Sequence, residues 1–367
     1  MRRLLSVSFL LWLLAPATAQ RSLAKLQQEF AAAVQQLGAE TTHEQQLALL
    51  KKQIPELERF LASEAKDADR WNGRLMLADL QLAVGEQKAA SKTLEGIDQN
   101  EAPALLLVSS AAMAQHLGLR PLRDAMITAA LGKSAPVEDQ LAMARLLMTV
   151  LHEVKKGEAL FDKALAEAKD DEQRAAVRWH RADGLRDRED LSEDAMFEEL
   201  EKLTNELPNT YWGGIAKDVL RATKLQRGDD AIDFKAKTRT GEDLTLASLR
   251  GKAVALVFFE ASDRDLPRLL DLLKASKTQL GDKLAIVGIC LNRDPGEIDK
   301  AIRALGITFP VIGEGKGFQT DAALRWFVAS PVVHVIDENG KVVALGQHAG
   351  TADARAELSE ALSGSAK

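Results

Sequence analysis

The stretch VFFEASDRDLPRLL, residues 257–270, leads an apolar strand through a short turn into the start of a helix. The carboxylates of Asp263 and Asp265 suit such a start, because a negative charge beside a helix N-terminus stabilises the helix by roughly 0.3–1 kcal/mol. The stretch contains no cysteine. The stretch therefore has negative charge at a helix N-terminus but no thiol that could take part in disulfide exchange.

Strand and helix patterns alternate around this stretch. The run DKLAIVGICLN, residues 282–292, predicts a second buried strand, and Asn339–Gly340 predicts a tight turn between strands at Val332–Asp337 and Lys341–Leu345. Helical patterns occupy residues 266–280, 295–305, 318–327 and 352–362. This order predicts an α/β domain over residues 228–367, with a partly parallel sheet between helices.

Several segments of this domain, taken in order, resemble thioredoxin-like proteins of the TlpA, redoxin and AhpC/TSA type. Asp233–Phe234 begins an N-terminal hairpin, and GEDLTLASLRGKAVALVFF, residues 241–259, matches that group's turn and first core strand. VGICLNRDPGEIDKAI, residues 287–302, matches its second strand and the next helix. ASPVVHVIDENGKVV, residues 329–343, matches its proline loop and last hairpin. The resemblance implies a thioredoxin-like fold.

The same resemblance places the family's two redox cysteines on Asp263 and Leu266, and the peroxidatic cysteine of a peroxiredoxin near Pro267. None of these positions holds a thiol, and a carboxylate cannot form a mixed disulfide. Pro331 occupies the family's cis-proline position. We therefore expect a redox-inactive domain in which the Ser330–Pro331 bond is cis, an isomer that proline tolerates.

Cys290 is the single cysteine of the chain, so no disulfide can form within it. It ends the apolar run AIVGIC, residues 285–290, and buried free cysteines are common and mostly inert. We expect Cys290 to be buried and slow to react. The alternative is a thiol-disulfide oxidoreductase or antioxidant that uses Cys290 with external thiols.

The remaining candidate residues have ordinary structural explanations. His334 alternates with apolar neighbours on a strand, which indicates a packed histidine, and His348 follows the hairpin as a surface residue. HEQQL at His43 and HEVKK at His152 lack the second histidine of a zinc-protease helix. GEGKGF, residues 313–318, lacks phosphate-loop spacing. We expect no cofactor and no metal site.

Residues 20–227 form a different region, in which apolar residues recur at three- and four-residue steps. The pattern predicts an all-α domain of eight to ten helices, packed as antiparallel hairpins. The segment around Gly85, Ala90 and Leu94 resembles degenerate tetratricopeptide repeats, although a non-repetitive bundle fits as well. The pattern of apolar residues changes from helical to strand-like after Arg227–Gly228, where we place the domain boundary.

The first residues, MRRLLSVSFLLWLLAPATAQ, have two arginines, an eleven-residue apolar run and the small residues Ala17 and Ala19. This pattern predicts a cleaved signal peptide over residues 1–19, hence a periplasmic or secreted chain without a stable membrane anchor. The formal net charge of −6 argues against a nucleic-acid partner. We expect an exported protein-binding or scaffold protein whose partners are proteins of the envelope or the extracellular space.

Overall fold

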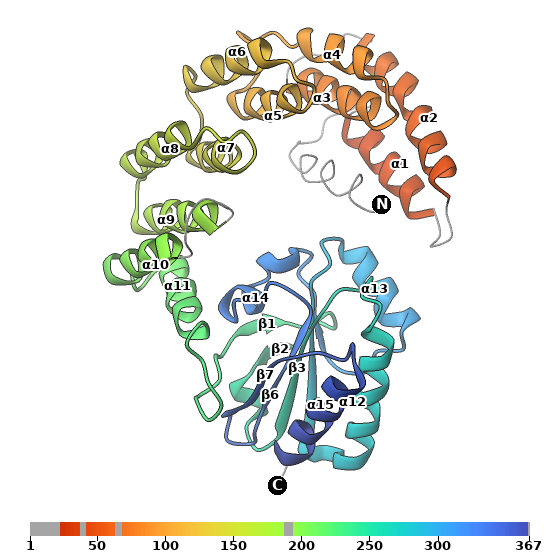
Figure 1. The fold of residues 1–367 in the computed structure, drawn as a ribbon, viewed down its shortest axis with the longest axis vertical. Coiled ribbons are helices and arrows are strands. Elements are labelled where there is room, and N and C mark those ends of the chain that lie inside the picture. Colours follow the sequence, from red (N-terminus) through yellow and green to blue (C-terminus); the bar gives the residue numbers. More distant parts are fainter. Residues whose placement is uncertain (1–22, 37–41, 63–67, 187–193, 366–367) are drawn as a thin grey trace. The chain divides into compact units, whose positions relative to one another are not determined.

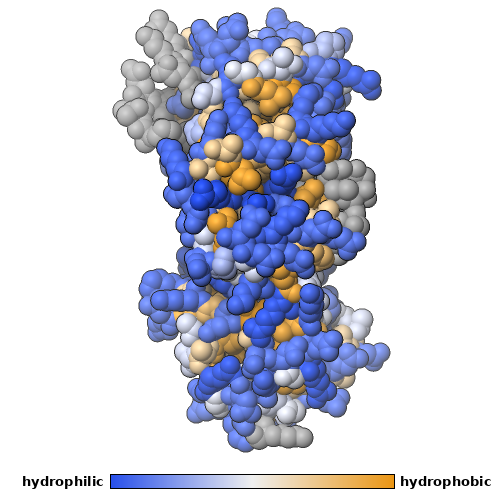
Figure 2. All heavy atoms as spheres, turned by 90° about the vertical axis from the view of Figure 1, so that its left-hand side faces the viewer, coloured by the Kyte–Doolittle hydropathy of each residue, from blue (hydrophilic) through white to orange (hydrophobic). Residues whose placement is uncertain are grey.

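The computed structural model describes residues 23–36, 42–62, 68–186 and 194–365. The predicted signal peptide, residues 1–19, lies outside these ranges. The chain divides into two compact units, Met1–Met196 and Phe197–Lys367, which are described separately below. Among the described residues, no helix combines the length and the apolar character that a membrane crossing requires. The face shown in Figure 2 is largely hydrophilic, with separate hydrophobic patches.

The first unit is built from helices that pair as hairpins (Figure 1). They are α1 (Leu23–Gln36), α2 (His43–Ala62), α3 (Ala68–Ala83), α4 (Gln87–Glu95), α5 (Ala104–His116), α6 (Arg120–Leu131), α7 (Val137–Thr149), α8 (Val154–Glu167) and α9 (Asp171–Arg186), and α10 (Asp194–Glu206) begins at its end. Within this unit, α3, α5, α7 and α9 form the inner row of a curved array, and α4, α6 and α8 form the outer row. The predicted all-α architecture is confirmed.

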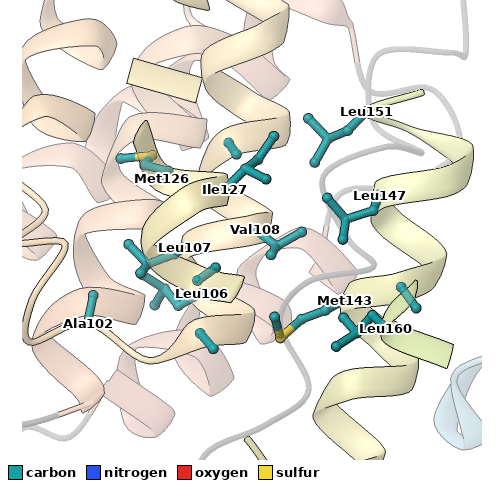
Figure 3. Packing of buried hydrophobic residues seen from close by; sticks show 14 of the residues in the cluster. Ala102, Leu106, Leu107, Val108, Met126, Ile127, Met143, Leu147, Leu151 and Leu160 are labelled. Atoms are coloured by element: carbon teal, nitrogen blue, oxygen red, sulfur yellow. The ribbon is translucent and has the colours of Figure 1, made fainter. Parts of the chain in front are cut away.

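The core of this unit lies between the two rows. Helix α5 is apolar on nearly all sides, which is typical of a helix surrounded by others, and it packs against α3, α6 and α7. Figure 3 shows Leu107 and Val108 of α5 beside Ile127 of α6 and Leu147 of α7. All four side chains are fully buried. Burial of each such side chain stabilises the fold by roughly 1.5–3 kcal/mol.

The number of helices differs from the prediction. Within the described residues, eleven helices, α1 to α11 (Tyr211–Ala222), precede residue 228, whereas the pattern predicted eight to ten. One missed break separates α7 from α8 at His152, which adopts φ 56°. A left-handed residue that is not glycine is uncommon, so the sequence contains no turn signal at this point.

The second unit contains a five-stranded sheet. Its strands are β3 (Ala253–Phe259), β4 (Leu284–Cys290), β5 (Val311–Ile312), β6 (Val332–Ile336) and β7 (Val342–Gln347), in the order β5-β4-β3-β6-β7. The pairs β3–β4 and β4–β5 are parallel, and β3–β6 and β6–β7 are antiparallel. A separate hairpin joins β1 (Lys235–Lys237) to β2 (Asp243–Thr245). The predicted partly parallel α/β domain is confirmed.

Helices cover both faces of this sheet, as β3 shows directly. Val257 and Phe259 face one apolar cluster, and Leu256 and Phe258 face the other, because side chains alternate along a strand. The first cluster is covered by α12 (Leu266–Leu280), α13 (Pro295–Ala304) and α15 (Ala352–Ser365). The second is covered by α14 (Asp321–Arg325) and by the end of α11. Burial on both faces explains the uninterrupted apolar run of β3.

Two details of this unit differ from the sequence patterns. The helix expected over residues 318–327 is a short 3-10 turn, η4 (Gly317–Gln319), followed by the five-residue α14, and the two-residue strand β5 was not predicted. The structural division at residue 197 also precedes the change of pattern at 228. It does so because most of α10 and the whole of α11, which packs on α14, belong to the second unit.

Candidate functional site

The carboxylates of Asp263 and Asp265, at the junction between β3 and α12, both accept hydrogen bonds from neighbouring residues of the chain. Asp265 is the N-cap residue of α12, and its N–H donates to Asp263 Oδ1 at 3.0 Å. The Asp265 carboxylate accepts from Arg268 Nη1 at 2.9 Å. Leu266 is the first helical residue and is 1% exposed. The two positions that the resemblance assigns to cysteines therefore hold a turn carboxylate and a core side chain.

Cys290 lies beside this junction, at the end of β4, where it pairs in register with Phe259 of β3. Its side chain is fully buried, as predicted. The thiol donates to Asn292 Oδ1 at 3.2 Å, and the same oxygen accepts from the N–H of Ala261 at 2.8 Å. Burial raises the pKa of the Cys290 thiol to about 11. The thiol is therefore protonated near neutral pH, which disfavours nucleophilic attack.

Pro331 lies at the same end of the sheet, directly before β6, whose Val332 pairs with Phe258 of β3. In the ranges that the structure describes, no peptide bond is cis, so the prediction of a cis Ser330–Pro331 bond is wrong. The trans isomer is intrinsically preferred by about 0.5–1 kcal/mol. Phe327, in the turn that follows α14, adopts φ 50°.

Asn292 is the member of this site that sequence reasoning missed. It ties the loop after β3 to the end of β4 through its two contacts, with Ala261 and Cys290. A polar residue just after a buried strand of a partly parallel sheet is the signal that could have identified it, because the carboxyl ends of such strands meet at one edge. The junction, Cys290, Asn292 and Pro331 all lie at this edge, and together they form a packed and hydrogen-bonded end of the sheet.

The histidines take the places expected of them. His334 is 7% exposed within β6, and His348 is exposed after β7. Among the residues that the structure describes, no three histidine, cysteine, aspartate or glutamate side chains gather as metal ligands would.

The sheet order, the flanking helices and the altered junction define a class: the second unit is a thioredoxin-like α/β domain without the cysteine pair. Residues 227–345 match the AhpC/TSA family, which confirms the resemblance. A similar curated protein is the thioredoxin-like protein YneN of Bacillus subtilis (strain 168). It is 28% identical over 131 residues, or 35% of this chain and 74% of that protein.

Solved structures also resemble this part of the chain. The putative thiol:disulfide interchange protein DsbE from Chlorobium tepidum is 23% identical, with 39% of this chain and 99% of that chain covered and a TM-score of 0.34. A putative protein disulfide isomerase from Bacteroides thetaiotaomicron is 23% identical, with 39% and 91% covered and a TM-score of 0.34.

Proposed function

We propose that this chain is an exported protein-binding or scaffold protein whose thioredoxin-like unit is redox-inactive. The observation that carries the proposal is the junction itself. Asp263 and Leu266 stand where the family has its thiols, and the one thiol of the chain, Cys290, is fully buried and protonated. Disulfide exchange requires an accessible thiolate, and release of the mixed disulfide requires a second thiol.

The helical unit supports the binding role. Helix hairpins stacked in two rows present an extended inner face to partners. On α7, four side chains that are not buried, Glu138, Ala142, Arg145 and Thr149, recur at three- and four-residue steps and form a stripe along the helix. A non-obligate interface is on the whole about as polar as the rest of a protein surface, so this mixed composition is compatible with partner binding.

The alternative is a thiol oxidoreductase or antioxidant that uses Cys290 with external thiols. The relatives in Chlorobium tepidum and Bacteroides thetaiotaomicron carry names of this kind, a thiol:disulfide interchange protein and a protein disulfide isomerase. In this chain, such chemistry first requires Cys290 to become exposed, and then a partner thiol to release the mixed disulfide.

Insulin reduction separates the two functions. With dithiothreitol as the reductant, the wild-type chain should not accelerate the precipitation of insulin above the rate with dithiothreitol alone, while a thioredoxin serves as the positive control. The Cys290→Ser variant should behave as the wild type does. Acceleration by the wild type that disappears in Cys290→Ser would establish the oxidoreductase and remove the redox-inactive proposal.

Photocrosslinking in the full-length chain tests the binding role. A benzophenone amino acid placed at Ala142 or Thr149 on the α7 stripe should capture discrete partners in the source envelope. The matched control is Lys163, an exposed position on the outer-row helix α8. We expect several-fold more product from the stripe than from the control. Equal yields from both rows would show that the inner face has no special role.

A further inference from the structure

Strand β4 has a free edge along its first half. Its residues Leu284 to Cys290 all pair with β3 on one side. On the other side, β5 pairs only with Gly288 and Ile289. Residues 284–287 therefore have a strand neighbour on one side only, inside a sheet whose other core strand, β3, is paired on both sides.

The hydrogen bonds show which groups face this free edge. Gly288 donates its N–H to the carbonyl of Pro310 at 2.9 Å, so the polar backbone groups of Gly288 point toward β5. Because these groups alternate in direction along a strand, those of Ile286 and Leu284 point the same way. The Leu284 carbonyl does accept from Lys277 Nζ on this side, at 2.7 Å.

Ile286 is the residue whose edge groups lack a ladder partner. Continuing the parallel ladder by one step would require residue 310 to donate its N–H to the Ile286 carbonyl. Residue 310 is proline, which has no N–H. Pro310 therefore keeps β5 from extending toward its N-terminus and leaves the Ile286 C=O without a ladder donor. Among the described residues, the Ile286 N–H has no backbone acceptor at Thr308 either, so both groups are directed at the free edge.

A cavity of about 500 Å³ follows this edge. Apolar side chains form its wall, among them Leu249, Leu273 and Phe309. Lys252, Lys274 and Lys277 also line it, and its lining contains no aspartate or glutamate. The edge thus combines unpaired backbone groups, an apolar cavity wall and the positive charge of three lysines.

We propose that an extended peptide segment with acidic side chains binds here by adding a strand to β4 at Ile286. The guest backbone would pair with the N–H and C=O of Ile286, its apolar side chains would enter the cavity, and its carboxylates would meet the lysines. A second copy of this chain fits poorly, because edge-to-edge pairing would bring three lysines against three lysines. This site belongs to the thioredoxin-like unit and is independent of the inner face of the helical unit.

Amide hydrogen exchange in the free, full-length chain tests the premise. The Ile286 amide should exchange at least about tenfold faster than that of Val287, which faces β3, because exchange reports local hydrogen bonding. Equal protection of the two amides at low protein concentration would overturn the proposal. Protection of Ile286 that grows with protein concentration, together with dimer formation in sedimentation, would overturn it in favour of self-pairing.

Peptide binding tests the occupant. The probe is acetyl-Glu-Val-Thr-Val-Glu-amide, compared with the same peptide methylated on its interior amide nitrogens and with a version carrying lysine in place of glutamate. The probe should bind and slow the exchange of Ile286, and both comparison peptides should bind at least about tenfold more weakly. Failure of the probe to bind at about 1 mM, or equal binding of the methylated peptide, would overturn the proposal.

Charge reversal in the protein completes the test. The double variant Lys252→Glu, Lys274→Glu should weaken probe binding by at least about tenfold, because rim charges set electrostatic complementarity. The control, Lys224→Glu, changes an exposed lysine outside the cavity and should leave binding within about twofold. Circular dichroism verifies that all variants fold. An equal effect of both substitutions would show that the cavity lysines do not define the site.

Discussion

The imidazole of His334 stacks on the indole of Trp326, with ring centroids 4.9 Å apart and an interplanar angle of 18°. His334 Nδ1 accepts from the N–H of Gly346 at 3.0 Å, which places the proton of the neutral ring on Nε2. Neither that Nε2 nor Trp326 Nε1 has a hydrogen-bond partner among the described residues. Burial alone lowers the pKa of His334 to about 4.

This pairing predicts a pH-dependent stability. Since the pKa of His334 falls from 6.5 to about 4 on folding, the unfolded chain binds the proton first. The free energy of unfolding should therefore be fully retained above pH 6.5 and should fall as the pH is lowered toward 4, by up to about 3 kcal/mol. Urea unfolding at pH 7 and pH 4.5 measures this difference.

The His334→Phe variant is the control for this prediction, because it keeps an aromatic ring but cannot titrate. It should lose less stability than the wild type between the two pH values. An identical pH dependence in the two proteins would assign the effect to other groups.

Cys290 should react slowly in the folded chain. Its thiol is fully buried and its pKa is raised to about 11 by burial. Labelling with Ellman's reagent at pH 8 should be at least about a hundredfold slower than in 6 M guanidinium, since reaction requires exposure of the thiolate. Rapid labelling of the native chain would contradict the buried site and favour the oxidoreductase.

Arg325 should hold α11 on α14. Its Nη1 lies 2.5 Å from Asp218 Oδ2 of α11, and its Nε lies 2.7 Å from Asp321 Oδ2. The Arg325→Met variant leaves two half-buried carboxylates without their cation, which should cost about 1–3 kcal/mol in urea unfolding. Lys237→Ala, which breaks the exposed pair with Asp243, should leave the midpoint unchanged. Similar losses in both variants would argue against a specific role for Arg325.

Two glycines should respond oppositely to alanine. A Cβ at Gly288 would lie 2.9 Å from the Phe309 ring and 3.0 Å from the Phe259 ring, so Gly288→Ala should destabilise the chain by about 1–3 kcal/mol. A Cβ at Gly214, within α11, meets nothing within 4 Å. Gly214→Ala should therefore stabilise by about 0.5–1 kcal/mol. Thermal denaturation measures both, and shifts of the same sign would contradict the packing around Gly288.

The fold of the second unit could be predicted because its signals are local. The apolar run of β3, the helix over Leu266–Leu280 and the Asn339–Gly340 turn each carry their own periodicity or turn chemistry. The break at His152 could not be predicted, because His152 takes the left-handed position after α7 that glycine usually occupies, in a local cap where the Glu153 N–H donates to the Leu147 carbonyl at 2.7 Å.

The candidate site was only partly predictable for the same reason. The missing thiols are visible in the sequence, and the burial of Cys290 follows from its apolar neighbours. The bridge through Asn292 and the free edge at Ile286 depend on strand register, which a single sequence does not specify.

The packing of α11 determines which segment must be kept together when the thioredoxin-like unit is joined to another protein. Ala222 and Leu225 lie against the apolar cluster on one face of the sheet, and Asp218 binds Arg325. A coding segment cut where the strand pattern begins would encode a sheet with part of that face open to water. The segment that can be transferred is thus the sheet together with the helical residues that precede it from Phe197 onward. Recombination points upstream of residue 197 should therefore be the ones that yield folded chimeras.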